Sequence, residues 1–124
     1  MGEALLYQYM KSWEHKDIVA FLATLHKDVV IVECYGPIYQ GMEEAKAWFS
    51  AWNQEGRVIR WQVMDIYKGA NPHMFFATWH FTYEHPWGKR ASFSGMSMLE
   101  TDGGKIRRLR EYRMQAAHYR PYQK

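Results

Sequence analysis

The spacing of hydrophobic residues predicts two helices in the first quarter of the chain. Between residues 4 and 14, apolar side chains recur every three or four positions, the period of a helix that buries one side. A second helix is expected to begin at Ile18, with Asp17 as its N-cap. We expect it to end at His26 and Lys27, because basic residues suit the negative end of the helix dipole. The two helices would form a short hairpin.

A short strand pair and a third helix are predicted next. The β-branched run at residues 29–32 predicts a strand, and the turn signal Gly36-Pro37 leads into a short return strand. Residues 42–53 then place aromatic side chains on one helical face, after two glutamates in the first turn.

From residue 57 onward the hydrophobic period changes from helical to two. Three long strands are expected at 57–68, 74–85 and 89–101, and a last strand from 105 to about 112, joined by turns that contain Gly or Pro. The predicted order is ααββαββββ, an α+β fold whose sheet is mainly antiparallel because its connections are short. One face of the strand at 74–85 is continuously apolar and needs a covering layer: Phe75, Ala77, Trp79, Phe81 and Tyr83.

Length and composition indicate one folded domain over residues 1–124. Hydrophobic residues make up 48% and aromatic residues 17% of the chain, which excludes an intrinsically disordered segment. The single cysteine, Cys34, excludes an intrachain disulfide, and we expect it to be a small buried hydrophobe in a reducing, cytoplasmic protein. No apolar run approaches the ~20 residues of a membrane-spanning helix, so we expect no membrane association.

The net charge of +3 is distributed unevenly along the chain. From Lys105 onward there are seven Lys or Arg and one acid, Glu111, against nine and twelve in the preceding residues. We interpret these cations as the solvated face of the last strand, because aromatic residues do not interleave with them as in a nucleic-acid surface. The six histidines show no metal-ligand spacing, so neither a metal nor another cofactor is expected.

Two stretches of the sequence also resemble a known group of proteins. The resemblance is to the SnoaL-like and ketosteroid isomerase-like families of the nuclear transport factor 2-like superfamily. It implies a cone-shaped fold in which three helices and a strongly curved sheet enclose an apolar pocket. The residues that carry it are Tyr9, Asp17, Asp28, Glu33, Gly36 and Gly41, and the turn Asp102-Gly103-Gly104-Lys105-Ile106.

The resemblance implies two catalytic residues, Glu33 and Tyr9. In ketosteroid isomerase a carboxylate after the first strand is the base, and a tyrosine on the first helix helps to form the oxyanion hole; these positions fall on Glu33 and Tyr9. The second oxyanion donor falls on Met96, which has no proton to donate. This departure argues against isomerisation of 3-oxosteroids. From the residues themselves, Glu33 follows four β-branched residues, and partial burial would raise its pKa toward the range of a general base.

Further residues are expected to line the pocket. Trp48 aligns with a pocket-lining aromatic of the family, and Met96 and Met98 would share one strand face turned toward the same space. Asp65 is a second candidate carboxylate. The full set of expected lining residues is Trp13, Trp48, Trp52, Asp65, Trp79, Met96 and Met98.

Two classes of function remain open from the sequence. The first is a pocket protein for a small apolar or polycyclic molecule that catalyses a cofactor-free proton transfer of the isomerase, cyclase or dehydratase type. Glu33 would abstract a proton α to a carbonyl, and Tyr9 would stabilise the enolate oxygen. The second is a non-catalytic ligand-binding or dimerisation module, which Met96 favours. A homodimer is expected in either case, because Met74 and Phe76 extend the apolar character of their strand to its other face.

Overall fold

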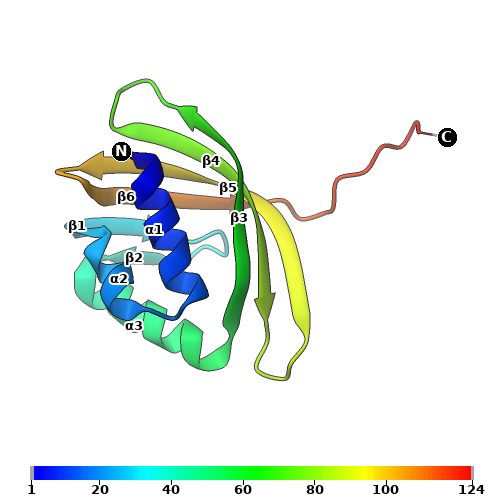
Figure 1. Cartoon of the computed structure of the whole chain (residues 1–124), viewed down its shortest axis with the longest axis horizontal. Coiled ribbons are helices and arrows are strands. Elements are labelled where there is room, and N and C mark those ends of the chain that lie inside the picture. The colour runs from blue at the N-terminus through cyan, green and yellow to red at the C-terminus, as the bar shows by residue number, and fades with distance from the viewer. Residues whose placement is uncertain (1, 124) are drawn as a thin grey trace.

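The computed structural model describes residues 2–123 as three helices packed on one six-stranded sheet (Figure 1). The predicted order ααββαββββ is confirmed. The elements are α1 (Gly2–Glu14), α2 (Ile18–Ala23), β1 (Leu25–Val32), β2 (Ile38–Gln40), α3 (Gly41–Glu55), β3 (Arg57–Lys68), β4 (Met74–Glu84), β5 (Arg90–Asp102) and β6 (Lys105–Arg113).

The sheet is mixed and strongly curved. Its strand order is β2-β1-β6-β5-β4-β3, and every pair is antiparallel except β1 and β6, where Ile31 lies opposite Leu109 in a parallel register. The strands β3, β4 and β5 bend around the helices, which cover the concave face (Figure 1). The expectation of a curved, mainly antiparallel sheet under three helices is therefore confirmed.

The first two helices follow the predicted pattern except at one end. The apolar stripe of α1 is buried, and the Asp17 carboxylate caps α2 by accepting the backbone N–H of Ala20 at 3.0 Å. The prediction that α2 continues to His26 and Lys27 is wrong: the helix ends at Ala23, and both residues belong to β1. The Thr24 carbonyl accepts the backbone N–H of Ile106 in β6 (2.8 Å), so pairing with the sheet replaces the last helical turn.

The inner face of β4 is the predicted one, and a glycine on the neighbouring strand makes room for its largest side chain. Trp79 is buried, and its indole N–H donates to the Ser97 hydroxyl of β5 at 2.8 Å. Gly95 lies opposite Trp79, and a Cβ at Gly95 would lie 2.4 Å from the indole ring and 2.3 Å from the Tyr112 carbonyl. Any larger residue at Gly95 would displace the ring.

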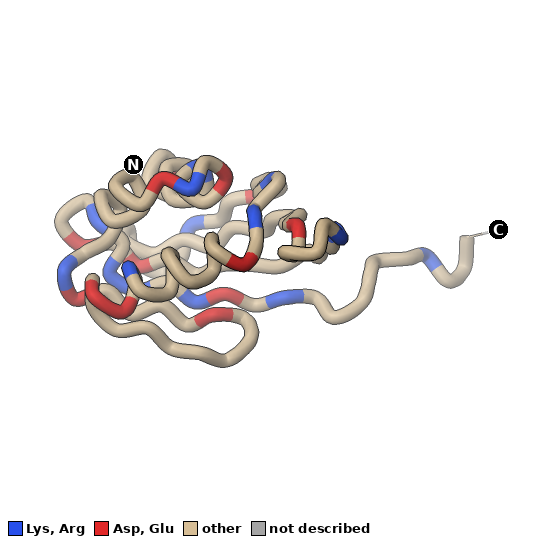
Figure 2. Tube along the Cα trace, turned by 90° about the horizontal axis from the view of Figure 1, so that it is seen from below, with Lys and Arg blue, Asp and Glu red and all other residues tan. Residues whose placement is uncertain are grey.

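Two basic residues of β6 illustrate how this strand contacts its neighbours. Arg108 pairs with Glu100 of β5 at 3.7 Å, and the Lys105 ammonium donates to the Ala23 carbonyl. Charges of both signs are distributed over the elements (Figure 2). Within residues 2–123, no helix combines the length and apolar character needed to cross a bilayer.

Candidate functional site

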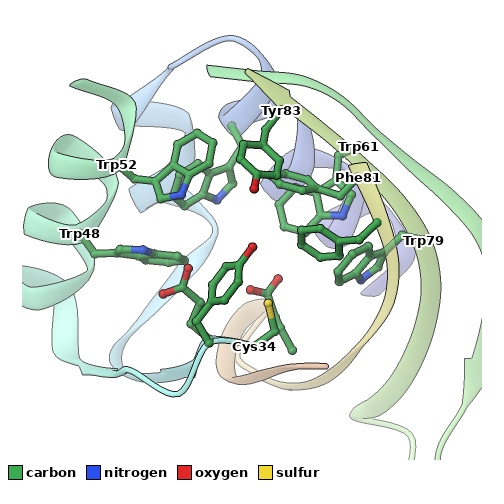
Figure 3. Close-up of a pocket in the computed structure, with 12 residues that line it drawn as sticks. Cys34, Trp48, Trp52, Trp61, Trp79, Phe81 and Tyr83 are labelled. Atoms are coloured by element: carbon green, nitrogen blue, oxygen red, sulfur yellow. The ribbon is translucent and has the colours of Figure 1, made fainter. Parts of the chain in front are cut away.

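A small cavity lies between the helices and the inner face of the sheet (Figure 3). Its volume is about 60 Å³, and nine of its twelve lining residues are aromatic. The lining residues are Trp13, Glu33, Cys34, Tyr35, Trp48, Trp52, Trp61, Trp79, Phe81, Tyr83, Phe93 and Glu111.

The aromatic walls come from elements that are distant in sequence. Trp48 and Trp52 project from α3, while the rings of β3 and β4 form the opposite side (Figure 3). The two sides approach closely, as the distance of 6.3 Å between the ring centroids of Trp52 and Phe81 shows. Within the β wall, Trp61 packs edge-on against Phe81 at 5.1 Å. Interlocked rings of this kind give the cavity a defined shape.

Glu33 reaches the cavity from the loop that follows β1. Its carboxylate accepts a hydrogen bond from the Tyr39 hydroxyl at 3.1 Å, and the side chain is half-buried. Burial raises the pKa of Glu33, while the bond from Tyr39 opposes that rise by stabilising the charged form. Glu33 is thus a partly buried carboxylate that lines a largely aromatic cavity.

A second carboxyl group, Glu111 of β6, was not identified from the sequence. It is 8% exposed, and its Oε2 atom has no hydrogen-bond partner among the described residues. Burial, with the nearby charge of Glu33, raises the pKa of Glu111 to about 8, so the group is mainly protonated at neutral pH. Its position two residues after Leu109 places Glu111 on the same, inward face of β6 and could have identified it. The neighbouring arginines made the whole strand look solvent-exposed.

Tyr9 lies one layer behind the cavity wall. Its side chain is 1% exposed, and its ring packs on Trp13 (6.4 Å) and Trp61 (5.9 Å), both of which line the cavity. Burial, and then the Glu111 carboxyl, raise the pKa of Tyr9 well above its usual value. Tyr9 is not among the residues that line the cavity, its buried hydroxyl has no hydrogen-bond partner among the described residues, and its role as an oxyanion donor stays a prediction.

Three of the expected lining residues lie elsewhere. Met96 and Met98 are on the outer face of β5, because Ser97 and Leu99 point inward and are buried. Asp65 is exposed and accepts a hydrogen bond from Thr78 at 3.3 Å outside the cavity. The alternation of side chains along β5 explains the two methionines. The small Gly95 and Ser97 must face inward to accommodate Trp79, so Met96 and Met98, which alternate with them, point outward. In contrast, the structure brings Glu33, Trp13, Trp48, Trp52 and Trp79 together around one cavity.

Cys34 lines the cavity next to Glu33. Burial raises the pKa of its thiol to about 11, and the Glu111 and Glu33 carboxyls add to the rise. A thiol with this pKa is protonated at neutral pH and is a poor nucleophile.

Tyr35 and Phe93 are joined by an arginine beside the cavity. The Arg113 guanidinium donates to the Tyr35 hydroxyl at 3.0 Å and lies 4.2 Å from the centroid of the Phe93 ring. Arg113 therefore connects the loop after β1 to β5 and β6.

Buried polar atoms without hydrogen-bond partners gather at this site. In residues 2–123 there are five such side-chain atoms, and three belong to lining residues: Trp13 Nε1, Trp61 Nε1 and Glu111 Oε2. Buried polar groups are rarely left unsatisfied, so such a cluster is typical of a place where a ligand or water binds. The same part of the chain contains no cluster of three His, Cys, Asp or Glu residues suited to a metal ion.

Comparison with known proteins identifies the family. A family model described as the SnoaL-like domain matches residues 6–109. The chain belongs to the SnoaL-like domain family. No curated protein sequence matches this SnoaL-like chain significantly.

Solved structures share the fold of this SnoaL-like domain. The Δ5-3-ketosteroid isomerase of a Mycobacterium species is 19% identical, with a TM-score of 0.77 over 88% of this chain and 89% of that one. An epoxide hydrolase of the LEH-like type from M. tuberculosis is 15% identical, with a TM-score of 0.78 over 90% and 80%. A ketosteroid isomerase-like protein from Catenulispora acidiphila, solved in complex with trimethylamine, is 14% identical, with a TM-score of 0.77 over 87% and 83%. At these identities the likeness establishes the cone-shaped fold.

Proposed function

We propose that this SnoaL-like domain binds a small carbonyl compound and moves a proton between two of its carbon atoms without a cofactor. The observation that supports this proposal is the pairing of two different carboxyl groups, Glu33 and Glu111, in one aromatic cavity. When the environments of two carboxyl groups push their pKa values apart, one group can act as the base and the other as the acid at neutral pH.

In the proposed step, the Glu33 carboxylate removes a proton from the carbon next to the carbonyl. The electron pair of that C–H bond forms the enolate, and the protonated Glu111 donates a hydrogen bond to the enolate oxygen. Protonated Glu33 then returns its proton to the γ carbon, so a β,γ-unsaturated ketone becomes its conjugated isomer. We assign the oxyanion donor to Glu111 in place of Tyr9, because Glu111 lines the cavity and Tyr9 does not.

The size of the cavity narrows the class of substrate. About 60 Å³ is small beside the roughly 300–1,000 Å³ of pockets for drug-sized ligands. A polycyclic substrate would require the indole walls to move apart much further than a single small ring or a short chain would. The trimethylamine complex of the C. acidiphila protein supports the idea that a ligand of this size suits the fold.

The test uses 3-cyclohexen-1-one, whose conversion to the conjugated 2-cyclohexen-1-one is followed by ultraviolet absorbance. We expect turnover by the purified protein and a loss of about 100-fold or more in Glu33→Gln. Glu111→Gln should lose about tenfold, because its amide still donates a hydrogen bond. Asp65→Asn, on the outer face, is the matched control and should keep full activity. Full activity in Glu33→Gln would exclude the mechanism.

The pH profile tests the same assignment. Catalysis needs Glu33 ionised and Glu111 protonated, so the rate should fall as the pH rises through about 8. Glu111→Gln should remove that descending limb and leave the acidic limb in place.

The second candidate function is ligand binding without turnover. It is favoured by the largely aromatic cavity wall: among residues 2–123, the lining side chains include nine aromatic rings and two carboxyl groups, Glu33 and Glu111. Quenching of tryptophan fluorescence by cyclohexanone, together with no isomerisation of 3-cyclohexen-1-one, would support binding alone.

We also propose that two copies associate through the outer face of the sheet. Met98 lies opposite Phe76, Met96 lies between Thr78 and Tyr112, and Tyr112 is 52% exposed, so this face carries apolar side chains. Light scattering during size-exclusion chromatography should give twice the chain mass, and Met98→Glu should give a monomer. A monomeric native protein at high concentration would refute this association.

A further inference from the structure

The cavity presents aromatic rings to one small volume from five secondary-structure elements and one loop. No Lys or Arg in the described part of the chain is among its lining residues. The rings belong to Trp13 of α1, Trp48 and Trp52 of α3, Trp61 of β3, Trp79, Phe81 and Tyr83 of β4, Phe93 of β5, and Tyr35 of the loop after β1.

We propose that this cavity binds a small organic ammonium ion, such as a methylated alkylamine, between the aromatic rings and the carboxyl groups of Glu33 and Glu111. The face of an aromatic ring is negative, and a cation within about 6 Å of the ring centroid is attracted to it, most strongly for Trp and where water is excluded. The Trp52 centroid lies 6.2 Å from that of Tyr83 and 6.3 Å from that of Phe81, so these rings pack against one another and a cation in the adjoining cavity is within range of more than one ring.

The two carboxyl groups distinguish a cationic ligand from a neutral apolar one. Aromatic walls alone would accept either ligand. A buried carboxyl group is unfavourable beside a neutral apolar ligand, because nothing replaces its lost hydration. An ammonium ion supplies the missing charge, and the unpartnered Oε2 of Glu111 is an acceptor for an ammonium N–H where the amine carries one.

Glu111 makes binding a proton-linked event. At neutral pH its carboxyl group is mainly protonated, and a cation beside it favours the ionised form. The ammonium ion therefore binds as Glu111 loses its proton to the solvent, and the net charge of the cavity is unchanged. The affinity must rise as the pH rises toward the pKa of Glu111 in the free protein.

Other charged or titratable groups face Glu111 and set the size of this effect. Glu33 and Cys34 approach from the loop after β1, and Tyr9 approaches from α1. Arg113 follows two residues later on β6, where Tyr35 and Phe93 hold its guanidinium outside the cavity lining. Glu33 disfavours the ionised form of Glu111, and a bound cation offsets that repulsion.

Ammonium binding does not rest on the isomerisation proposed above, because it requires no turnover. Both use the same cavity, with Glu111 protonated during isomerisation and ionised beside a cation. A small ammonium ion should therefore inhibit the isomerisation competitively.

The experiment compares choline with 3,3-dimethylbutan-1-ol, its neutral isostere, by isothermal titration calorimetry on the full chain. We expect choline to bind at least about tenfold more tightly. Its affinity should rise several-fold between pH 6 and pH 8, with proton release detected in buffers of different ionisation enthalpy. Equal or tighter binding of the isostere would overturn the proposal.

Substitutions test the contribution of the aromatic rings to choline binding separately from that of the carboxyl group. Glu111→Gln should abolish the proton release and weaken choline about tenfold while leaving the isostere unchanged. Trp48→Leu should weaken choline at least about fivefold, whereas Trp87→Leu, at a ring that is 72% exposed and outside the cavity, should not. If Glu111→Gln does not fold, as judged by circular dichroism, Glu33→Gln replaces it and should also weaken choline selectively. Unchanged selectivity in the folded variant would refute a role for the carboxyl groups.

The two proposals can fail separately. Isomerisation of 3-cyclohexen-1-one without preference for choline would refute ammonium binding and keep the proposed function. Selective choline binding without isomerisation would do the reverse.

Discussion

The two faces of the sheet differ sharply although the same strands build both. On the inner face, Trp79 and Phe81 of β4 meet Phe93 of β5 around a cavity that also contains Glu33 and Glu111. On the outer face, the alternate residues of these strands are partly or fully exposed, as Met96, Met98 and His80 are.

The comparison teaches that position decides the chemistry of a carboxyl group. Asp65 of β3 and Glu111 of β6 are both strand carboxylates. Asp65 is exposed and bonded to Thr78, whereas Glu111 is buried with an unpartnered oxygen, and its pKa rises to about 8. Burial therefore leaves the Glu111 carboxyl group mainly protonated at neutral pH.

The largest expected difference between the faces concerns adjacent residues of β4. Trp79→Ala should lower the free energy of unfolding by about 3–5 kcal/mol, because it removes a buried ring and leaves a cavity. His80→Ala, one residue away on the outer face, should change it by about 0.5 kcal/mol or less. Urea denaturation measures both values. A similar loss in the two variants would mean that the outer face is as tightly packed as the inner one.

A smaller effect is expected in the pH dependence of stability. The pKa of Glu111 is about 8 in the folded chain against 4.5 for an unperturbed group, so the folded state holds a proton that the unfolded state has released between these values. The stability contributed by Glu111 is therefore fully present below about pH 4.5 and should fall by on the order of 3 kcal/mol between pH 5 and pH 8. Glu111→Gln should flatten this fall, leaving a residual slope of the same sign from Glu33, whose pKa is also raised.

Thermal unfolding of the native chain and of Glu111→Gln, recorded in steps from pH 5 to pH 8, measures the difference. Parallel curves for the two proteins would show that Glu111 is ionised in the folded state at neutral pH.

The smallest effect is expected at the outer carboxylate. Asp65→Asn should change the free energy of unfolding by about 0.5 kcal/mol or less, because the group is exposed and its partner Thr78 can bond to water instead. Urea denaturation of the native chain and of the variant measures this value. A loss as large as that expected for Trp79→Ala would contradict a loosely held side chain at Asp65.

Much of the fold could be predicted because its signals are local. The period-two pattern predicted a strand at residues 57–68, which are the observed bounds of β3. Asp17 marked the start of α2, because its side chain bonds to the backbone N–H of Ala20, three residues later. The inner face of β4 was also predictable, because its five alternate apolar residues leave no competing choice. The end of α2 was not predictable in this way, since Thr24 bonds to Ile106 in a strand more than 80 residues away.

The candidate site was only partly predictable. The family resemblance pointed to Glu33 and Trp48, and the helical stripes of α1 and α3 carry the other tryptophans expected at the pocket, Trp13 and Trp52. Glu111 was missed, and Met96 and Met98 were assigned to the wrong face. On β5, the polar or small residues Gly95 and Ser97 point inward, and the apolar methionines point outward, which reverses the usual relation between polarity and burial.

The sequence by itself therefore determined the order of the elements, the apolar faces of α1, α3 and β4, and the family of the chain. The order and the apolar faces follow from residue periods and short-range bonds that act within a few positions, and the family follows from the residues that carry the resemblance. Only the tertiary structure decided which face of β5 and β6 meets the core, and with it the pairing of Glu33 and Glu111. The reason is steric: the Trp79 ring needs the space above Gly95 and Ser97, and the register between neighbouring strands transmits that requirement across the sheet to β6.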